Sequence, residues 1–306
     1  MPTNGMRNIK LLLSYDGTAY HGWERQKDLC TLQQTLEKAI ESLTGEPANV
    51  IAGGRTDAGV HALGQVANFR CNTRHDCSAL RRALNALLPD DFRVLAVQDV
   101  DESFHATYAV KTKLYRYAVH DGPVLDPFLR RYVCHCNWPM DDVAMHLAAQ
   151  CLLGTHDFSS FETTGAPRQT SVRTITHVAV CRAGSGRLWW QGSEVRSQRS
   201  EVRSQRSEVT EQSADGNDPR SEVSVRRSAI SDQQSAINPP SPFIFLEVAA
   251  DGFLYNMVRA IAGTLINVGR GYWPAERVRE ILEACDRTVA GPTAPPHGLF
   301  LARVEY

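Results

Sequence analysis

The chain has 306 residues, of which 42% are hydrophobic and 22% charged, so it is long enough for one large domain or two medium-sized ones. Its 33 basic residues nearly balance its 34 acidic residues, and a net charge of −1 argues against a protein that binds polyanions indiscriminately. No apolar run approaches the length of a membrane span, and residues 1–7 lack the apolar stretch of a secretory signal, so we expect a cytoplasmic location.

The first third of the chain is predicted to alternate strands with helices. Short apolar runs predict strands over residues 9–15, 66–70 and 92–98. Apolar residues at helical spacing predict a helix over residues 31–43, which Gly45 ends. A second helix is predicted to begin at a Ser78 cap and to end before Pro89. Its inward-facing residues are expected to be Leu80, Leu84, Leu87 and Leu88.

The rest of the chain continues this mixture. Strands are predicted over residues 114–119, 131–136, 175–181, 188–191, 243–249 and 299–304. Helices are predicted over residues 141–154 and 254–268, and a last one from Pro274. Because short turns as well as helices separate the strands, this order indicates an α+β fold with a largely antiparallel sheet. We expect two similar α/β halves, residues 1–110 and 111–306, with a central active-site cleft between them.

Residues 192–241 interrupt the second half. The heptad from Ser193 to Arg199 recurs immediately, and a third copy begins at Ser207. One valine per heptad is too little for a coiled coil, and the Ser-, Arg- and Glu-rich composition buries too little surface to offset its ordering entropy. We predict a disordered, low-complexity insertion in a hairpin loop; a flexible arm that touches RNA or another partner is the alternative.

The cysteines and the remaining motif searches point to no metal or cofactor. Eight cysteines are scattered without a CxxC pair, so reduced, mostly buried thiols are expected. Cys134 and Cys136 flank His135, but strand alternation places both thiols on one face, where they are expected to be small core residues and not zinc ligands. The chain contains no Walker A, dinucleotide GxGxxG or HExxH motif, so no cofactor is expected.

One segment, between residues 105 and 131, is locally basic. Its cations are Lys111, Lys113, Arg116, Arg130 and Arg131, against Asp121 and Asp126. The aromatic residues interleaved with them are Tyr108, Tyr115, Tyr117 and Phe128. A run of charges is usually a solvated surface, but a mixture with aromatic rings suits stacking on unpaired bases. The segment is therefore a candidate RNA-binding face.

A glycine-rich loop, residues 53–69, carries the candidate catalytic group. It combines Arg55 and Asp57 with glycines at 53, 54, 59 and 64, which let another chain or a ligand approach the backbone closely. An Asx turn, in which Asp57 bonds its own backbone, is one interpretation of this pattern. The nearby cation and the strand that anchors the loop favour a reactive site instead.

The string GGRTDAGVH, residues 53–61, resembles the catalytic motif of the tRNA pseudouridine synthase A family. Two further signatures of that family follow in order, KLYRY at residues 113–117 and DGFLYNMVR at residues 251–259. Shorter matches lie at residues 15–18, 22–23, 154–158, 172–175 and 294–299. The resemblance extends over nearly the whole chain outside the insertion. It implies two α/β halves that share a continuous antiparallel sheet, with the active site in the groove along it.

The resemblance also implies an activity and the residues for it. Members of the family isomerise uridine to pseudouridine at positions 38–40, in the anticodon stem-loop of tRNA. They act as homodimers and without a cofactor. On this basis Asp57 is expected to be the catalytic carboxylate, acting as a nucleophile at C1′ or as a base at C2′. Arg259 is expected to pair with Asp57, and Tyr115 to stack on the target base and to be the candidate acceptor of its C5 proton. The residues expected to bind the substrate are Arg55, Lys113, Tyr115, Arg116 and Leu299.

Several alternatives remain open. Thr107 stands where the family usually has arginine, and loss of a phosphate contact there is expected to lower affinity more than the chemical step. Arg259 could be a surface residue at the edge of a helix, and Tyr115 a packing residue on a strand. A tRNA-binding module of the same fold with little or no catalysis is a second function, and a glycoside hydrolase or base glycosylase a third, although hydrolysis usually needs a second acid.

Overall fold

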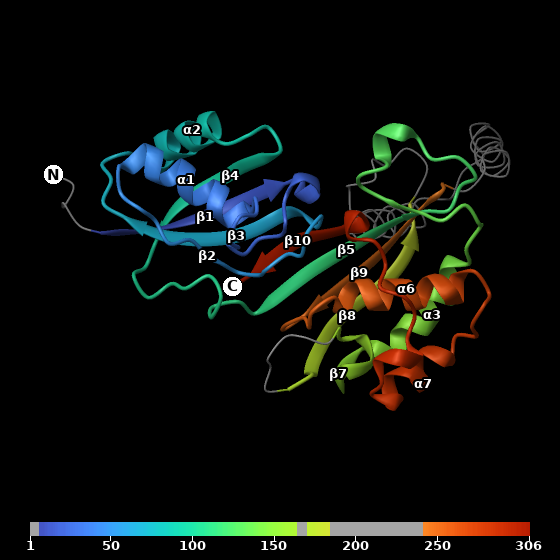
Figure 1. The fold of residues 1–306 in the computed structure, drawn as a ribbon. Helices are drawn as coiled ribbons and strands as arrows, with labels where there is room; N and C mark the ends of the chain where they lie inside the picture. The colour runs from blue at the N-terminus through green and yellow to red at the C-terminus, as the bar shows by residue number, and fades with distance from the viewer. Residues whose placement is uncertain (1–5, 164–169, 184–240) are drawn as a thin grey trace, which may run out of the picture.

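A computed structural model describes residues 6–163, 170–183 and 241–306. Its strands are β1 (Arg7–Tyr15), β2 (Ile51–Ala52), β3 (His61–Cys71), β4 (Phe92–Val100), β5 (Thr112–His120), β6 (Cys134–His135), β7 (Gly154–Asp157), β8 (Val172–Arg182), β9 (Phe243–Ala250) and β10 (Leu299–Glu305). Together they form one sheet in the order β4-β1-β3-β10-β5-β9-β8-β7, with β2 beside β3 and β6 beside β5 (Figure 1). The pairs β10–β3 and β5–β6 are parallel and the others antiparallel. The predicted α+β fold on a largely antiparallel sheet is therefore confirmed.

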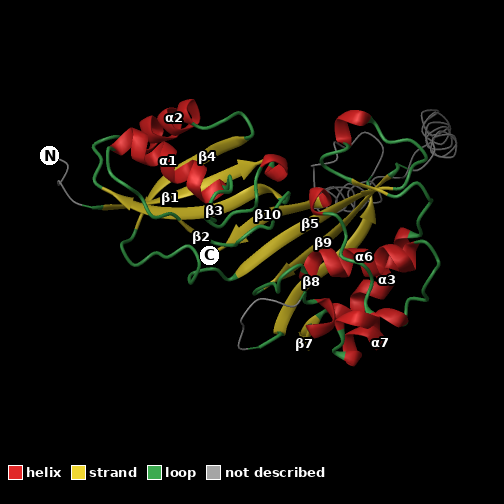
Figure 2. Cartoon of the chain, viewed as in Figure 1, coloured by secondary structure: helices red, strands yellow, loops and turns green. Residues whose placement is uncertain are grey.

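Five helices pack against this sheet within the described residues, in two groups (Figure 2). They are α1 (Leu32–Thr44), α2 (Cys77–Leu87), α3 (Asp142–Ala149), α6 (Met257–Gly269) and α7 (Arg277–Ala284). Helix α2 contacts β4 and α1, whereas α3 contacts β8 and α6 contacts β5. Each end of the long sheet therefore has its own helical layer. The division of the chain at residue 110 stays a prediction.

Local sequence signals account for the first helix. The Thr31 hydroxyl accepts a hydrogen bond from the Gln34 backbone N–H, which satisfies one of the donors left unpaired at a helix start. Leu32 and Leu36 are fully buried on the inner face. Gly45 ends the helix in the left-handed region at φ 75°, where its N–H bonds the Glu41 carbonyl.

The second helix begins two residues earlier than predicted. Its cap is Asp76, whose Oδ1 accepts from the Ala79 N–H at 2.6 Å, whereas the Ser78 hydroxyl accepts from the Arg82 guanidinium instead. Leu87 was expected to face inward, but its side chain is 50% exposed because the last turn presents Leu84 and the following Leu88 to the core.

Other boundaries differ because of contacts made elsewhere in the chain. The strand predicted over residues 131–136 is reduced to β6, since the Arg131 carbonyl and the Tyr132 hydroxyl bond to His61 and Asp16. The helix expected to end at residue 154 ends at Ala149, and Gly154 opens β7. Helix α6 starts at Met257 and α7 at Arg277, each three residues later than predicted. The predicted strand 188–191 and, except for residue 241, the predicted insertion 192–241 lie outside the described residues.

Strand β10 lies inside the sheet and joins the β4-β1-β3 half to the β5-β9-β8-β7 half. On one side Phe300 and Leu301 pair in parallel with His61 and Ala62 of β3. On the other side β10 pairs in antiparallel register with β5, and Leu299 stands opposite Tyr117. One strand near the end of this sequence therefore aligns the glycine-rich loop before β3 with the tyrosines of β5.

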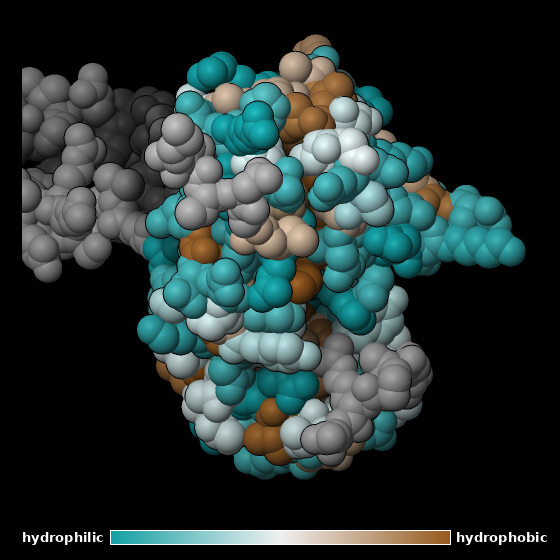
Figure 3. Space-filling model, turned by 90° about the vertical axis from the view of Figure 1, so that its left-hand side faces the viewer, coloured by the Kyte–Doolittle hydropathy of each residue, from teal (hydrophilic) through white to brown (hydrophobic). Residues whose placement is uncertain are grey.

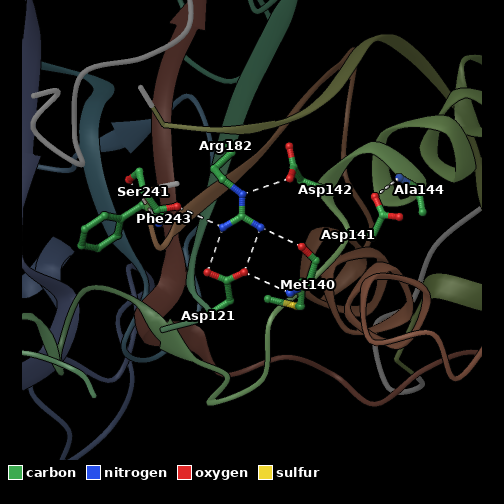
Figure 4. Close-up of polar contacts among 8 residues, drawn as sticks. All are labelled: Asp121, Met140, Asp141, Asp142, Ala144, Arg182, Ser241 and Phe243. Atoms are coloured by element: carbon green, nitrogen blue, oxygen red, sulfur yellow. Dashed lines mark hydrogen bonds and ion pairs between the residues drawn. The ribbon is translucent and has the colours of Figure 1, made fainter. Parts of the chain in front are cut away.

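A partly buried cation fixes the end of β8 where the chain leaves the sheet (Figure 4). The Arg182 guanidinium lies 2.9 Å from each oxygen of Asp121 and 3.0 Å from Asp142. It also donates to the main-chain oxygens of Met140, at 2.7 Å, and Ser241, at 3.0 Å. Since Ser241 is the first described residue on the return to β9, this cluster holds the departing and returning segments together.

We expect Arg182→Met to lower the free energy of unfolding by about 3 kcal/mol, because Asp121 would keep its buried charge and lose its bidentate partner. The Asp121 side chain is only 6% exposed. Chemical denaturation followed by circular dichroism measures the change. The control is Arg277→Met, which removes a partly exposed pair with Glu280 on α7 and should change stability by less than about 1 kcal/mol. Equal losses in the two variants would contradict this account of the cluster.

The surface shown in Figure 3 is mostly hydrophilic, with hydrophobic residues in small, separate patches. This is the usual appearance of a protein surface in contact with water. Within the described ranges no helix has both the length and the apolar character needed to cross a bilayer.

Candidate active site

A cleft of about 970 Å³ opens where the β4-β1-β3 half of the sheet meets the β5-β9-β8-β7 half. Most of its wall is formed by five segments that are distant in sequence: residues 21–24 with Gln26, residues 49–58, His105 with Thr107, Lys113 with Tyr115 on β5, and residues 253–258 before and at the start of α6; Gln33 of α1 and Val60 also line it. Leu299, the first residue of β10, completes it. All three sequence signatures therefore contribute to one cavity.

The loop that carries Asp57 is held by the turn after β1. The Trp23 N–H donates to the Thr56 carbonyl at 2.9 Å, and the hydroxyls of Tyr15 and Thr56 are hydrogen bonded at 2.9 Å. A Cβ on Gly17 would lie only 2.0 Å from the Val60 carbonyl oxygen, so the close approach of the two segments requires glycine there. The Asp57 backbone is thus fixed on both sides.

Asp57 faces the guanidinium of Arg259, which is carried by α6, a helix that contacts β5. Its Oδ2 lies 3.8 Å from Nη1 of Arg259, and the two side chains are 30% and 16% exposed. Arg259 itself is oriented by hydrogen bonds from Nε to the Ala294 carbonyl, at 2.8 Å, and from Nη1 to Asn256 Oδ1, at 2.6 Å. The cation is therefore held in place independently of Asp57 and can favour the charged form of that carboxylate.

Asn256 helps to orient the Arg259 guanidinium beside Asp57. It precedes α6 in the left-handed conformation, with φ 61°, which asparagine tolerates better than most residues. Its side-chain amide donates to the Thr163 hydroxyl at 3.1 Å, while its Oδ1 accepts from Arg259. Sequence reasoning placed residue 256 inside the helix and assigned it no role.

Tyr115 lines the same cleft from β5 and is only 7% exposed. Its ring meets Phe253 edge to face, with centroids 4.9 Å apart and planes at 81°. Burial, reinforced by the neighbouring Tyr15 and Asp57, raises the pKa of the Tyr115 hydroxyl well above its usual value. The phenol is therefore neutral at physiological pH.

The remaining predicted residues separate into two groups. Leu299 is buried in the cleft wall, and the aliphatic part of Lys113 runs past Gly54 at its floor. Arg55 also lines the cleft, but its side chain is 77% exposed and pairs with Glu24 at 2.5 Å. These three residues are accessible from the cavity or its rim.

Arg116 is not brought to the cleft. It is 7% exposed and pairs with the buried Glu247 directly across from it on β9, with Nε and Nη2 at 2.9 and 2.7 Å from Oε1. Successive residues of a strand point to opposite faces, so Arg116 and the cleft-lining Tyr115 are on opposite sides of the sheet. We therefore leave Arg116 out of the substrate-binding group.

His61, at the end of the glycine-rich string, has a supporting position that the sequence analysis did not assign. It is 1% exposed; its Nε2 donates to the Arg131 carbonyl at 2.9 Å, and its Nδ1 accepts from the Gly17 N–H at 3.1 Å. The ring also stacks on Phe300 of β10, with centroids 4.8 Å apart. His61 thus connects the end of the Asp57 loop to three other segments. Its place in the glycine-rich motif is the one sequence feature that could have indicated this role.

The chain is similar to known proteins over most of its length. The profile of a family described as tRNA pseudouridine synthase matches residues 12–109 and 148–306, which is most of the chain. The chain belongs to the tRNA pseudouridine synthase family. Proteins named tRNA pseudouridine synthase A from Thermoanaerobacter sp. (strain X514) and Acetivibrio thermocellus are 38% and 39% identical to it over 301 residues, covering 98% of this chain and all of each relative. One of the same name from Aeromonas salmonicida is 35% identical, over 97% of this chain and 90% of the relative.

One expected departure from the pseudouridine synthase family has a structural counterpart. The Thr107 hydroxyl donates to the carbonyl of Ala52, the last residue of β2, at 2.8 Å. A threonine in this position fastens the loop between β4 and β5 to the strand that leads into the Asp57 loop. Its short side chain thereby supports the wall of the cleft.

Proposed function

We propose that this member of the family isomerises uridine to pseudouridine in the anticodon stem-loop of tRNA, with Asp57 as the catalytic carboxylate. The observation that carries the proposal is the position of Asp57 on a cleft wall, 3.8 Å from the fixed Arg259, with Tyr115 in the same cavity. The match of all three signatures to the resembling family supports the same assignment, including uridines 38–40 as targets.

The reaction conserves atoms and electrons. The N1–C1′ bond of uridine breaks, the base turns, and a C5–C1′ bond forms; C5 loses a proton and N1 gains one. No oxidant, reductant or activated group is therefore demanded, and we propose that the side chains act without a cofactor. Asp57 can attack C1′ as a nucleophile or remove a proton at C2′, and both routes start from the ionised carboxylate.

Arg259 is proposed to keep Asp57 ionised in the cleft once RNA excludes water. A carboxylate that loses solvent is disfavoured unless a cation or hydrogen-bond donors compensate. Because Arg259 is anchored by Ala294 and Asn256, it supplies this charge without a costly rearrangement when substrate binds.

Tyr115 is proposed to place the base. A uracil in the cleft would lie against its ring and against Leu299, which are both buried in the wall. Because the raised pKa keeps the phenol protonated, it can receive the C5 proton only if its own proton departs in the same step. Holding the detached base at the correct distance from C1′ is the role that the neutral ring can fill throughout.

The target uridine must leave the base stack to reach Asp57, as substrates of other base-modifying enzymes do. Arg55 and Lys113 are proposed to contact the RNA backbone at the cleft, since both line it. We further propose, on the family resemblance, that the protein acts in the cytoplasm as a homodimer.

The test is tritium release from tRNA transcripts labelled at C5 of uridine, because the isomerisation replaces that C–H bond. The expected result is release from a transcript with uridines at the anticodon stem-loop and none when those uridines are changed to cytidine. Release from the altered transcript at the same rate would overturn the proposed target. A catalytically weak RNA-binding module would instead bind the transcript tightly and release no tritium.

A further inference from the structure

An exposed tyrosine lies in a loop that supplies two residues to the cleft wall, and its ring is stacked on one of them. The side chain of Tyr108, in the loop between β4 and β5, is 83% exposed. Its ring lies nearly parallel to the imidazole of His105, with centroids 4.2 Å apart and planes at 23°. His105 and Thr107 both line the cleft, so the pair extends the cleft wall outward.

The two rings are mounted on a well-fixed loop. The backbone N–H groups of Thr107 and Tyr108 point to Nδ1 of His105, at 3.3 and 3.4 Å, which orients the imidazole. Between them the Ala106 N–H donates to Asn68 and the Ala106 carbonyl accepts from the Tyr306 hydroxyl, each at 2.9 Å. An exposed ring on such a support loses little conformational freedom when it binds a flat partner.

The surroundings favour a nucleic-acid partner. Lys113 lies in the adjacent cleft, and the Lys10 ammonium sits 4.6 Å from the centre of the Tyr306 ring that supports the loop. A cation in the cleft next to the loop that carries an exposed aromatic ring suits an RNA strand, whose bases stack on the ring while a phosphate meets the cation. A protein partner would be expected to use a continuous apolar surface, whereas the exposed residues near Tyr108 include the polar Thr107 and the charged Lys111.

We propose that His105 and Tyr108 form a stacking platform for one unpaired base of the RNA, adjacent to the target uridine. This inference rests on the proposed function, since it assumes an RNA substrate with its target in the cleft. The platform contributes to binding and to the choice of uridine. It makes no contact with the reacting atoms, so Tyr108 is a binding residue and not a catalytic one.

The first experiment measures tritium release from a labelled anticodon stem-loop RNA at a series of concentrations. Tyr108→Ala is expected to raise KM about tenfold, the scale of one lost base–aromatic stack, while kcat changes less than about twofold. Tyr108→Phe keeps the ring and should behave as wild type. Tyr272→Ala removes a tyrosine that is 64% exposed, beyond α6 and outside the cleft lining, and should also leave KM unchanged.

The second experiment locates the stacked base. Each nucleotide flanking the target is replaced in turn by an abasic residue, and KM is measured with wild type and with Tyr108→Ala. At the nucleotide whose base stacks on the platform, the abasic change should raise the KM of wild type about tenfold. The same change should have little further effect on the KM of Tyr108→Ala.

The outcomes separate the two proposals. If wild type releases no tritium from any RNA, the proposed function fails. If wild type is active but Tyr108→Ala keeps the wild-type KM, the platform is wrong and the proposed function stands. The same conclusion follows if the changes in KM caused by Tyr108→Ala and by each abasic residue multiply at every position, because the ring and the base then act independently. Because Tyr108 is exposed, the circular dichroism spectrum of Tyr108→Ala should match that of wild type, and a rise in KM cannot then be assigned to unfolding.

Discussion

Asp57→Asn is expected to reduce tritium release from labelled tRNA by at least about a thousandfold. The amide has nearly the same shape but cannot act as a nucleophile at C1′ or as a base at C2′, and general base or nucleophilic groups contribute on this scale. Since Asp57 lies on the wall of a preformed cleft, the variant should still bind tRNA with an affinity within a few-fold of wild type.

The controls for this change vary the charge and its position separately. Asp90→Asn removes a fully exposed carboxylate next to Arg93 and should leave release unchanged. Asp57→Glu keeps the charge but displaces it by one methylene, which is expected to cost about a hundredfold through misplacement alone. Undiminished release by Asp57→Asn would remove Asp57 from the mechanism, whatever its position in the cleft.

Arg259→Met is expected to lower kcat for isomerisation by about a hundredfold, because the variant removes the cation 3.8 Å from Asp57. Arg259→Lys should recover only part of this loss. A lysine keeps one charge but cannot donate along both directions that the guanidinium uses, to Ala294 and to Asn256. Steady-state tritium release gives kcat and KM for each variant.

A pH series distinguishes electrostatic support of Asp57 from simple structural damage. If Arg259 keeps the carboxylate ionised, its removal should shift the acidic limb of the kcat profile to higher pH, since more base is then needed to ionise Asp57. Arg270→Met, at the other end of α6, serves as the control and should leave both kcat and the profile as in wild type. An unchanged acidic limb in Arg259→Met would contradict the proposed pairing.

Signals confined to a few residues were predicted well from the sequence. The Gly45 end of α1 depends on a bond within one helix, and the antiparallel character of the sheet follows from short connections. The two residues from distant signatures, Asp57 and Arg259, were expected to meet, and the structure places them 3.8 Å apart. Motif resemblance carried that expectation, because residue spacing alone gives no distance across a fold.

Predictions that required knowledge of a distant partner were less accurate. Both Tyr115 and Arg116 were assigned to the substrate, although neighbours on a strand face opposite sides and only one can line a cleft there. Which one does is decided by Glu247, which pairs with Arg116 from β9. The strand expected at residues 131–136 is shorter because Arg131 and Tyr132 bond to His61 and Asp16 instead. These two partners lie at the start of β3 and just after β1, in the other half of the sheet.

The position of β10 has a consequence for how the molecule acquires its activity. Its pairing of Phe300 with His61 links residues roughly 240 positions apart, whereas β1, β3 and β4 pair within the first hundred. Contacts between such distant segments carry the largest loop-closure entropy and tend to form late. We therefore expect a folding intermediate in which the Asp57 loop exists on a β3 strand with an open edge. Catalytic competence would appear only when β10 closes that edge, so the recovery of activity on refolding should lag behind the recovery of secondary structure.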